Sequence, residues 1–313
     1  MVKTKNSIRT LLFLLPLALI VAVSGCVTPS TSGIGVVINT FQSDFTTINS
    51  GDTLSLLLEV ENTGEIRAQN VRAELTGISA QDWGSFIDVQ DLGSLLEVTY
   101  QPDGTAVKGQ VKTAKWNELR APSLVRGMQH TYTPEVRVSY DYATVAQKPI
   151  TIVDKDELRN IILSGEGLPS SKATSYSSGP INVEIAAASY VQTTDIGTGT
   201  TYDIFPINVH IENMQFTSGS TVVKPITGGG TETYPIYVTI EPPSGTSFVH
   251  SGGQYTDCSQ FVIVDLFKGR DADITCELEV TNPPSISQEG LITVNLEYRY
   301  ALGAQTSVSV IGI

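Results

Sequence analysis

The 313-residue chain is poor in the side chains that most often build chemical sites. It contains three histidines, three cysteines and two tryptophans, and charged residues make up only 16% of it. The histidines, His130, His210 and His250, lack the short spacing of a metal-ligand pair. Lys and Arg number 19 against 32 Asp and Glu. Because phosphate binding needs clustered cations, a nucleic-acid partner is not expected.

Sequence motifs of the common enzyme classes are also missing. The chain has no G-x-S-x-G, Walker-type or G-x-G-x-x-G motif, and Gly228 to Gly230 is typical of a loop tip between strands. Asp271 and Asp273 are close to other acids but lack the twelve-residue loop of a calcium site, so they are interpreted as solvated surface acids. We therefore expect no catalytic residues, no metal site and no cofactor.

The amino terminus has the order of an export signal. Lys3, Lys5 and Arg9 precede an uncharged apolar run from Leu11 to Val23. At 13 residues, this run is shorter than the ~20 that a membrane-spanning helix needs. Small residues follow and lead to Cys26, so residues 1–25 are predicted to be a signal peptide.

The segment Val23-Ser24-Gly25-Cys26 resembles the lipobox of prokaryotic lipoproteins. That resemblance implies cleavage before Cys26 and a lipid on its sulfur, which would hold the protein at the outer face of the cell membrane. Two alternatives are an ordinary secretory signal in which a cysteine falls there by chance, and an uncleaved signal anchor.

A small, polar segment follows the cysteine. Residues 26–34 contain mainly Thr, Ser and Gly with one proline, and are predicted to be a flexible tether. Cleavage would leave 16 Lys and Arg against 32 Asp and Glu, which changes the net charge from −13 to −16. Anionic headgroups repel such a chain, so we expect it to stand off the membrane on its tether.

Beyond residue 34 the hydrophobic pattern is that of β-strands. Val71, Ala73 and Leu75 alternate with polar residues, as do Val136 and Val138, and short apolar runs end at Gly, Pro, Asn or Asp. One buried and one solvated face is typical of an antiparallel sandwich. Strands are predicted at 35–41, 54–61, 70–75, 136–142, 181–185, 207–212, 234–240, 260–267, 273–280 and 291–300, with a closing strand at 307–311.

Two segments recur along the chain. The sequence from Leu58 to Asn62 resembles Val209 to Asn213, and Val138 to Tyr142 resembles Leu296 to Tyr300. The two offsets differ by only a few residues, which indicates duplication of one architecture rather than a residue-level repeat. Chance similarity between alternating strands is the alternative.

One of these segments also resembles a known class of domain. Val60-Glu61-Asn62-Thr63-Gly64, followed by an alternating strand from Ala68 to Leu75, is similar to the CARDB-type Ig-like domains of prokaryotic surface proteins. The later segment at Asn213 lacks the glycine, so the match there is weaker. Archaeal lipoproteins with tandem Ig-like domains are the closest likeness in overall organisation. The resemblance implies adhesion, envelope scaffolding or assembly, and folds alone do not determine function.

A short helix is predicted between the two β regions. Asp154 or Asp156 can cap a helix from Asp154 to Leu163, and Gly165 ends it. Leu158, Ile161 and Ile162 form its apolar stripe. The fold is therefore predicted as all-β, with two tandem Ig-like antiparallel sandwiches at 35–152 and 180–313 joined by a helix and flexible linker at 153–179.

With Cys26 lipidated, Cys258 and Cys276 remain. An even number of cysteines in an exported chain favours one disulfide, and two buried thiols are the alternative. In a simple hairpin around Gly269 and Arg270, the two cysteines would be ~16 Å apart, which is too far for a bond. A disulfide therefore predicts that the segment bends back or that the two strands lie in different sheets.

Tyrosines form the last pattern. Tyr140, Tyr142, Tyr298 and Tyr300 alternate on the two resembling strands. The rings are expected to fill a sandwich face, although an exposed set would make a stacking platform for a glycan or a partner.

The expected function is that of a lipid-anchored, non-enzymatic surface protein with an interaction, adhesion or scaffolding role. Its partners would be the membrane, through Cys26, and a surface protein or glycan that the sequence does not identify. The alternatives are a carbohydrate-binding surface module, which uses the tyrosines or the loops at Gly228 to Gly230 and Gly252 to Gly253, and a subunit of a pilus- or stator-type assembly that recruits partners at open sheet edges.

Overall fold

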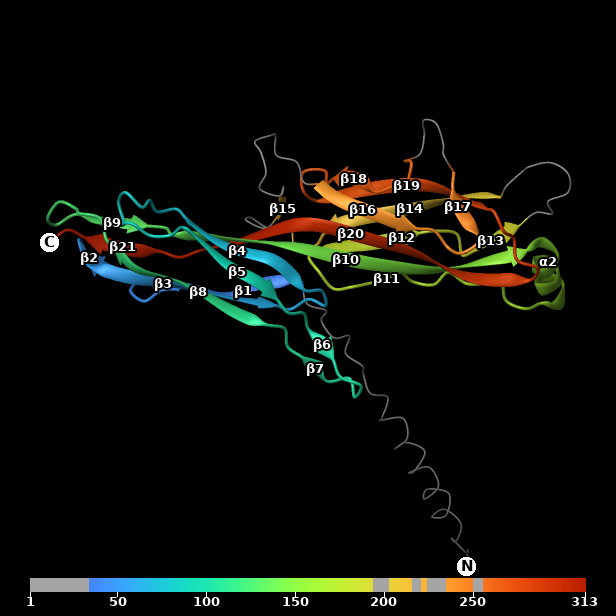
Figure 1. Ribbon diagram of the computed structural model, residues 1–313, viewed down its shortest axis with the longest axis horizontal. Coiled ribbons are helices and arrows are strands. Elements are labelled where there is room, and N and C mark those ends of the chain that lie inside the picture. Colours follow the sequence, from blue (N-terminus) through green and yellow to red (C-terminus); the bar gives the residue numbers. More distant parts are fainter. Residues whose placement is uncertain (1–33, 194–202, 216–220, 224–234, 250–255) are drawn as a thin grey trace, which may run out of the picture. The chain divides into compact units, whose positions relative to one another are not determined.

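The fold was analysed in a computed structural model, which describes residues 34–193, 203–215, 221–223, 235–249 and 256–313. In these ranges the chain is mostly β-strand, with several antiparallel sheets and one short helix, α2 (Lys155–Ser164). Residues Gly33–Ile313 form one compact unit. Figure 1 shows the strands coloured along the sequence. The predicted all-β class is confirmed at this level.

The strands fall into an N-terminal repeat, β1 to β10, and a C-terminal repeat, β12 to β21. The strands of the first are β1 (Val36–Ser43), β2 (Thr47–Asn49), β3 (Thr53–Asn62), β4 (Ala68–Thr76), β5 (Val89–Leu95), β6 (Thr99–Tyr100), β7 (Ala106–Val107), β8 (Val111–Arg120), β9 (Gln129–Tyr132) and β10 (Glu135–Asp154). After α2 and β11 (Ser175–Tyr176), the strands of the second are β12 (Ile181–Ala186), β13 (Tyr190–Thr193), β14 (Ile204–Asn213), β15 (Thr221–Val223), β16 (Pro235–Glu241), β17 (Thr246–Phe248), β18 (Val262–Asp265), β19 (Asp271–Val280), β20 (Ser287–Gln305) and β21 (Val308–Ile311).

Each repeat contributes one sheet of its own, and both share a larger one. Among the described residues, β1-β3-β8 forms the sheet of the N-terminal repeat, and β12-β14-β19-β17 forms that of the C-terminal repeat. The shared sheet has nine strands and the main order β18-β16-β20-β10-β4-β5. Burial alternates along β3 and along β10 up to Ile152, which turns one side of each sheet to the core, because successive side chains of a strand point to opposite faces.

The strand registers of the two repeats correspond pair by pair. In the N-terminal repeat Val36 pairs with Asn62, and in the C-terminal repeat Ile181 pairs with Asn213. The next pairs along each sheet agree as well: β3–β8 corresponds to β14–β19, β4–β10 to β16–β20, and β4–β5 to β16–β18. The two halves therefore share one β architecture, as the resembling segments in the sequence predict.

The two repeats are joined through their last long strands. β10 and β20 pair antiparallel from Glu135–Gln305 to Val153–Ser287, and the pairing continues through β9 and β21. Asp141 lies opposite Arg299 at the centre of this ribbon. A pseudo-two-fold axis at that pair relates Tyr140 to Tyr298 and Tyr142 to Tyr300, because the same offset relates every residue of one strand to the other.

The ends of this ribbon are exchanged between the repeats. Strand β21, at the end of the C-terminal repeat, lies between β2 and β9 of the N-terminal repeat, parallel to β2. Reciprocally, the end of β10 pairs in parallel with β13 of the C-terminal repeat. Backbone pairing thus crosses the predicted boundary segment 153–179 in both directions. Each repeat is completed by a strand of the other.

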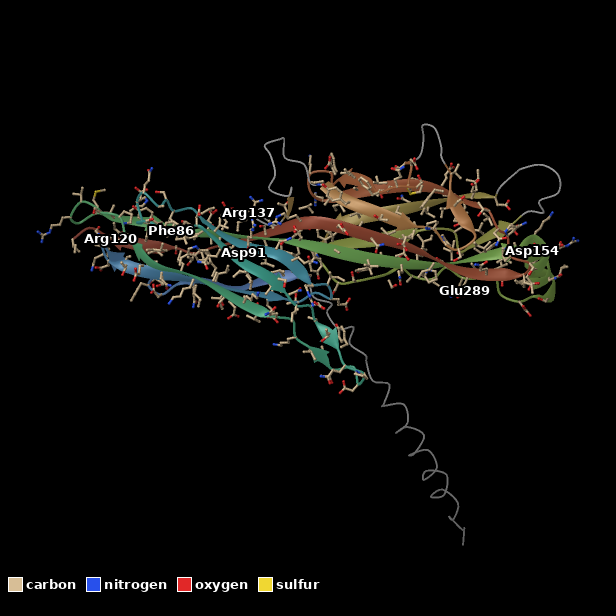
Figure 2. All side chains as sticks on the ribbon, in the orientation of Figure 1. Phe86, Asp91, Arg120, Arg137, Asp154 and Glu289 are labelled. Atoms are coloured by element: carbon tan, nitrogen blue, oxygen red, sulfur yellow. A yellow bond between two sulfur atoms is a disulfide. The ribbon has the colours of Figure 1, made fainter. Side chains whose placement is uncertain are left out.

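Helix α2 follows β10 directly (Figure 2, where Asp154 is labelled at its start). The Asp154 carboxylate accepts bonds from the backbone N–H groups of Asp156 and Glu157, and Gly165 ends the helix in the left-handed conformation. These caps confirm two sequence expectations. The predicted apolar stripe is only partly correct. Leu158 is buried, but Ile162 is 59% exposed, since a helix this short covers its strands with a single side chain.

Candidate functional site

The centre of the β10–β20 ribbon carries an ion pair between the buried Arg299 and Asp141, whose side chain is 42% exposed. The Arg299 guanidinium donates from Nη1 to Asp141 Oδ1 at 2.7 Å and from Nη2 to Ser139 Oγ at 3.0 Å. Asn70 Nδ2 donates to the other Asp141 oxygen at 2.6 Å. Arg299 is only 8% exposed, and its Nε has no hydrogen-bond partner among the described residues. One donor of a buried cation is therefore unused, which is uncommon in folded proteins.

A pocket of about 420 Å³ lies around this charge pair. Its charged residues are Arg299 and Glu297 from β20, Asp141 from β10, and Arg67 just before β4. Tyr237 from β16 contributes an aromatic ring, 39% exposed. The remaining lining residues are Ile66, Gln69, Tyr142, Ala143, Pro235 and Tyr298.

The pocket opens mainly on the face of the shared sheet away from the core. Asp141 and Glu297 occupy the positions between buried neighbours on their strands, so their side chains point to the opposite face. The site was not found from the sequence, because its residues come from four strands and a loop of two repeats. The signal for it was present in the offset between Val138–Tyr142 and Leu296–Tyr300, which contain Asp141 and Arg299 at equivalent positions.

On the core side of the same ribbon lie the four predicted tyrosines. Tyr140, Tyr142, Tyr298 and Tyr300 are each at most 4% exposed. Neighbouring rings are 5.8 to 6.2 Å apart between centroids, in edge-to-face or tilted arrangements. A stacking platform for a glycan or partner requires exposed rings, and burial removes all four from such contacts. The expectation that they fill a sandwich face agrees with their position.

Each buried hydroxyl of this cluster has a polar partner. Tyr142 donates to the Ser178 carbonyl at 3.0 Å, Tyr300 donates to Asn213 Oδ1 at 2.9 Å, and Tyr298 bonds with Thr144 at 2.9 Å. The Tyr140 hydroxyl accepts from the backbone N–H of Val36 at 3.4 Å. Desolvation by burial raises the pKa of all four hydroxyls, because the interior disfavours a phenolate.

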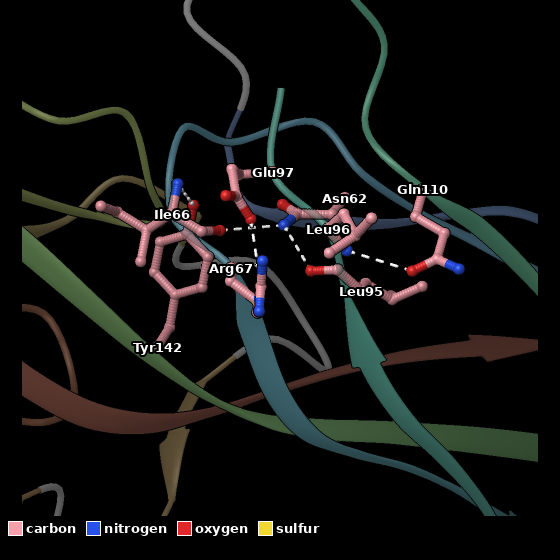
Figure 3. Close-up of polar contacts among 8 residues, drawn as sticks. All are labelled: Asn62, Ile66, Arg67, Leu95, Leu96, Glu97, Gln110 and Tyr142. Atoms are coloured by element: carbon pink, nitrogen blue, oxygen red, sulfur yellow. Dashed lines mark hydrogen bonds and ion pairs between the residues drawn. The ribbon is translucent and has the colours of Figure 1, made fainter. Parts of the chain in front are cut away.

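A buried asparagine ends the equivalent strand of each repeat. Asn62, fully buried, donates from Nδ2 to the carbonyls of Ile66 and Leu95 at 2.9 and 3.2 Å (Figure 3). Its Oδ1 accepts from the Gly64 N–H. Asn213 similarly donates to the Gly269 carbonyl and accepts from the Gln215 N–H. Each side chain thus closes a turn and ties it to a neighbouring segment. The Asn62 turn leads directly to Ile66 and Arg67 of the pocket.

Replacing Asn62 with Ala is expected to lower the free energy of unfolding by about 3 kcal/mol. Two carbonyls and one N–H would lose their partners in a buried site, and each such loss costs about 1–3 kcal/mol before the site relaxes. Urea unfolding followed by circular dichroism measures the change. The matched control is Asn39→Ala, which removes an exposed asparagine bonded only to side chains and should change stability by less than about 0.5 kcal/mol. Equal effects of the two substitutions would contradict the assignment.

The two remaining cysteines form a disulfide. Cys258 and Cys276 have Cα atoms 6.0 Å apart and are separated by 18 residues. The hairpin is not simple: β18 pairs with β16 in the shared sheet, whereas β19 pairs with β14 and β17 in the other. The bond therefore links a segment before β18 to a strand of the other sheet. A disulfide was expected only if the segment bends back or if the two cysteines belong to different sheets, and the structure agrees with that condition.

Of the other sequence candidates, His210 is described and is not among the residues that line the pocket. His210 faces Asp273 across the β14–β19 pair, with 3.0 Å between Nδ1 and Oδ1. Cys26 with its tether up to residue 33, Gly228 to Gly230, His250, and Gly252 to Gly253 lie outside the described residues. In the part of the chain that is described, no helix is both long and apolar enough to span a bilayer.

Comparison with known proteins finds no matching family model and no matching curated protein.

Proposed function

We propose that the chain is an exported, lipid-anchored protein of the outer cell surface, and that its two repeats are Ig-like domains serving a non-enzymatic interaction, adhesion or scaffolding role. The observation that carries the scaffolding role is the reciprocal exchange of β10 and β21 between the repeats. Tandem domains on a flexible linker move independently by default. Exchanged strands instead join the two repeats into a single unit, which suits a scaffold that holds its binding partners at a fixed distance and orientation.

Two features support the proposed location. The order of charged, apolar and small residues up to Cys26 is that of a lipoprotein signal. The Cys258–Cys276 disulfide suits an oxidising compartment, where such bonds form and persist. A lipid on Cys26 and a polar tether would place the unit at the surface without a membrane-spanning segment.

Replacing Cys26 with Ser is expected to move the protein from the membrane fraction to the soluble or released fraction, because the sulfur that carries the lipid is lost. Fractionation of cells followed by detergent partition measures the change. Ser30→Ala, in the same tether segment, is the control and should stay with the membrane. Unchanged partition of the Cys26→Ser protein would contradict the anchor.

Crosslinking in intact cells, followed by mass spectrometry, tests the interaction role. A reproducible surface partner crosslinked to residues of the shared sheet is the expected result. Turnover of a small molecule by the purified full chain would contradict a non-enzymatic role. Crosslinks between many copies of this chain would favour the assembly-subunit alternative, in which open sheet edges recruit neighbours.

A further inference from the structure

We propose that the pocket at the centre of the β10–β20 ribbon binds a neutral saccharide, which stacks on Tyr237 and hydrogen-bonds to Glu297, Asp141 and Arg299. This inference deepens the proposed interaction role by naming a site and a ligand class. Tyr142 and Tyr298 are among the lining residues, but the tyrosines at 140, 142, 298 and 300 are each at most 4% exposed, so none of their rings offers a stacking face.

The dimensions of the pocket suit a ligand of one or a few sugar rings. Its volume of about 420 Å³ lies in the lower part of the range for small-molecule sites. The floor is held in place by the backbone pairing of β10 with β20, and one wall is held by the pairing of β16 with β20. A ligand would therefore find its polar partners already positioned, which reduces the entropy lost on binding.

The charges around the pocket favour a neutral ligand. The lining has two arginines and two acids, and both arginines are already paired, Arg299 with Asp141 and Arg67 with Glu97, which lies outside the lining, at 3.3 Å. An anion would approach two carboxylates, and a cation would approach two guanidinium groups. The lining nevertheless offers many donors and acceptors, with Gln69 adding both. Saccharide hydroxyls both donate and accept, so they match a mixed lining better than a group of one charge does.

The unpartnered Nε of Arg299 points to a missing hydrogen-bond acceptor. Its guanidinium is more than nine-tenths buried and already bonded through Nη1 and Nη2 to Asp141 and Ser139. The Nε–H has no partner among the described residues. That atom has almost no solvent-accessible surface, so a ligand hydroxyl accepts from it only after a small shift of the side chain. Because an unsatisfied buried donor is costly, such a bond gains more than the same bond at the surface.

The pseudo-two-fold axis provides an internal comparison for Tyr237. Tyr237 lies opposite Glu297 on the C-terminal side of the axis, and Arg72 lies opposite Ser139 at the corresponding place on the N-terminal side. On the next strand of the sheet, Tyr237 pairs with Ile263, which is 57% exposed, whereas Arg72 pairs with Asp91. An exposed aromatic and aliphatic strip thus occurs beside the pocket on one side only. Aromatic rings offer an apolar face to the C–H face of a sugar, and a charged pair does not.

Binding is tested with the full chain in detergent. The probes are an array of immobilised neutral oligosaccharides and, for the tightest binder, calorimetric titration. The unmodified protein should bind, and Tyr237→Ala should weaken binding at least tenfold through loss of the stacking face. Glu297→Gln should weaken it about fivefold, since an exposed carboxylate acceptor becomes an amide. Tyr100→Ala, which removes an exposed tyrosine of β6 outside the pocket, is the control and should bind as the unmodified protein does.

Several results would overturn the inference. They are no binding to any neutral oligosaccharide, equal affinity of the Tyr237→Ala and unmodified proteins, and preferred binding of anionic sugars. Displacement of the sugar probe by an extended peptide that binds more tightly would assign the site to peptides instead. If the Tyr237→Ala protein does not fold, as judged by thermal unfolding, the sugar affinities of the Glu297→Gln and Gln69→Ala proteins test the site instead. Membrane partition does not depend on these residues, so the sugar site and the lipid anchor can fail separately.

Discussion

Replacing Val310 with Asp is expected to unfold the N-terminal repeat, although Val310 lies only three residues from the carboxyl terminus. Val308 and Val310 are fully buried, and β21 lies between β2 and β9. An unpaired carboxylate at position 310 would enter the core that β2 helps to form. We expect a loss of about 4 kcal/mol in the free energy of unfolding, which belongs to the severe end of single substitutions.

Tryptophan fluorescence makes this prediction specific to one repeat. Both tryptophans of the chain, Trp83 and Trp116, belong to the N-terminal repeat and are buried. Urea titration of their emission should therefore show the full loss in the Val310→Asp protein. Ser307→Asp adds the same charge at an exposed position just before β21 and is the control, with an unchanged midpoint. If the tryptophan signal of Val310→Asp matched that of the control, the strand exchange would be contradicted.

Stability is also expected to fall steeply above pH 10. Burial raises the pKa of Tyr140, Tyr142, Tyr298 and Tyr300 above the ordinary value of 10.0. In the unfolded chain the same hydroxyls lose their protons near pH 10, so above that pH the folded state binds more protons than the unfolded state. Stability is then lost as pH rises, and it is retained in full below pH 10.

The size of the alkaline effect follows from the number of buried hydroxyls. Each hydroxyl that the fold keeps neutral lowers the free energy of unfolding by up to about 1.4 kcal/mol for every pH unit above 10. Four such hydroxyls together lower it by roughly 5 kcal/mol per pH unit. Urea midpoints measured at pH 8, 9, 10 and 11 should stay level and then drop. Phenolate absorbance provides the second measurement.

In the folded protein at pH 11, the four buried tyrosines should remain unionised. Ionisation of all twelve tyrosines of the chain at that pH without unfolding would contradict the prediction. Tyr176→Phe, at an exposed position, is the matched control and should leave the pH dependence of stability unchanged.

Local features of the fold were predictable because their causes are local. Alternating residues such as Val136, Val138 and Tyr140 indicate a strand with one buried face, and the structure buries all three. Asp154 and Gly165 mark the ends of the helix, because a carboxylate satisfies free N–H groups and a glycine accepts the left-handed conformation. Equivalent strands of the repeats were recognisable from the segments ending in Asn62 and Asn213.

The candidate site was predictable only in part. The sequence suggests that the tyrosines fill a sandwich face and that the two cysteines are bridged by something other than a simple hairpin, and the structure has both features. It does not indicate that Asp141 meets Arg299 or that Tyr237 lies beside them. Many charged residues alternate along these strands, and an alternating pattern tells which face a residue occupies but not which strand lies next to it.

The sequence by itself indicated many of the strands, which of their faces are apolar, and that one architecture occurs twice, but it missed β5, β8 and the second half of β10. Only the tertiary structure decided that β10 and β20 pair along their whole length and that each repeat is completed by the last strand of the other. The physical reason is that the backbone hydrogen bonds that join strands are the same for every residue. Which strand pairs with which therefore depends on the packing that covers the apolar faces of both repeats at the same time. That pairing brings Asp141, Tyr237 and Arg299 to one pocket.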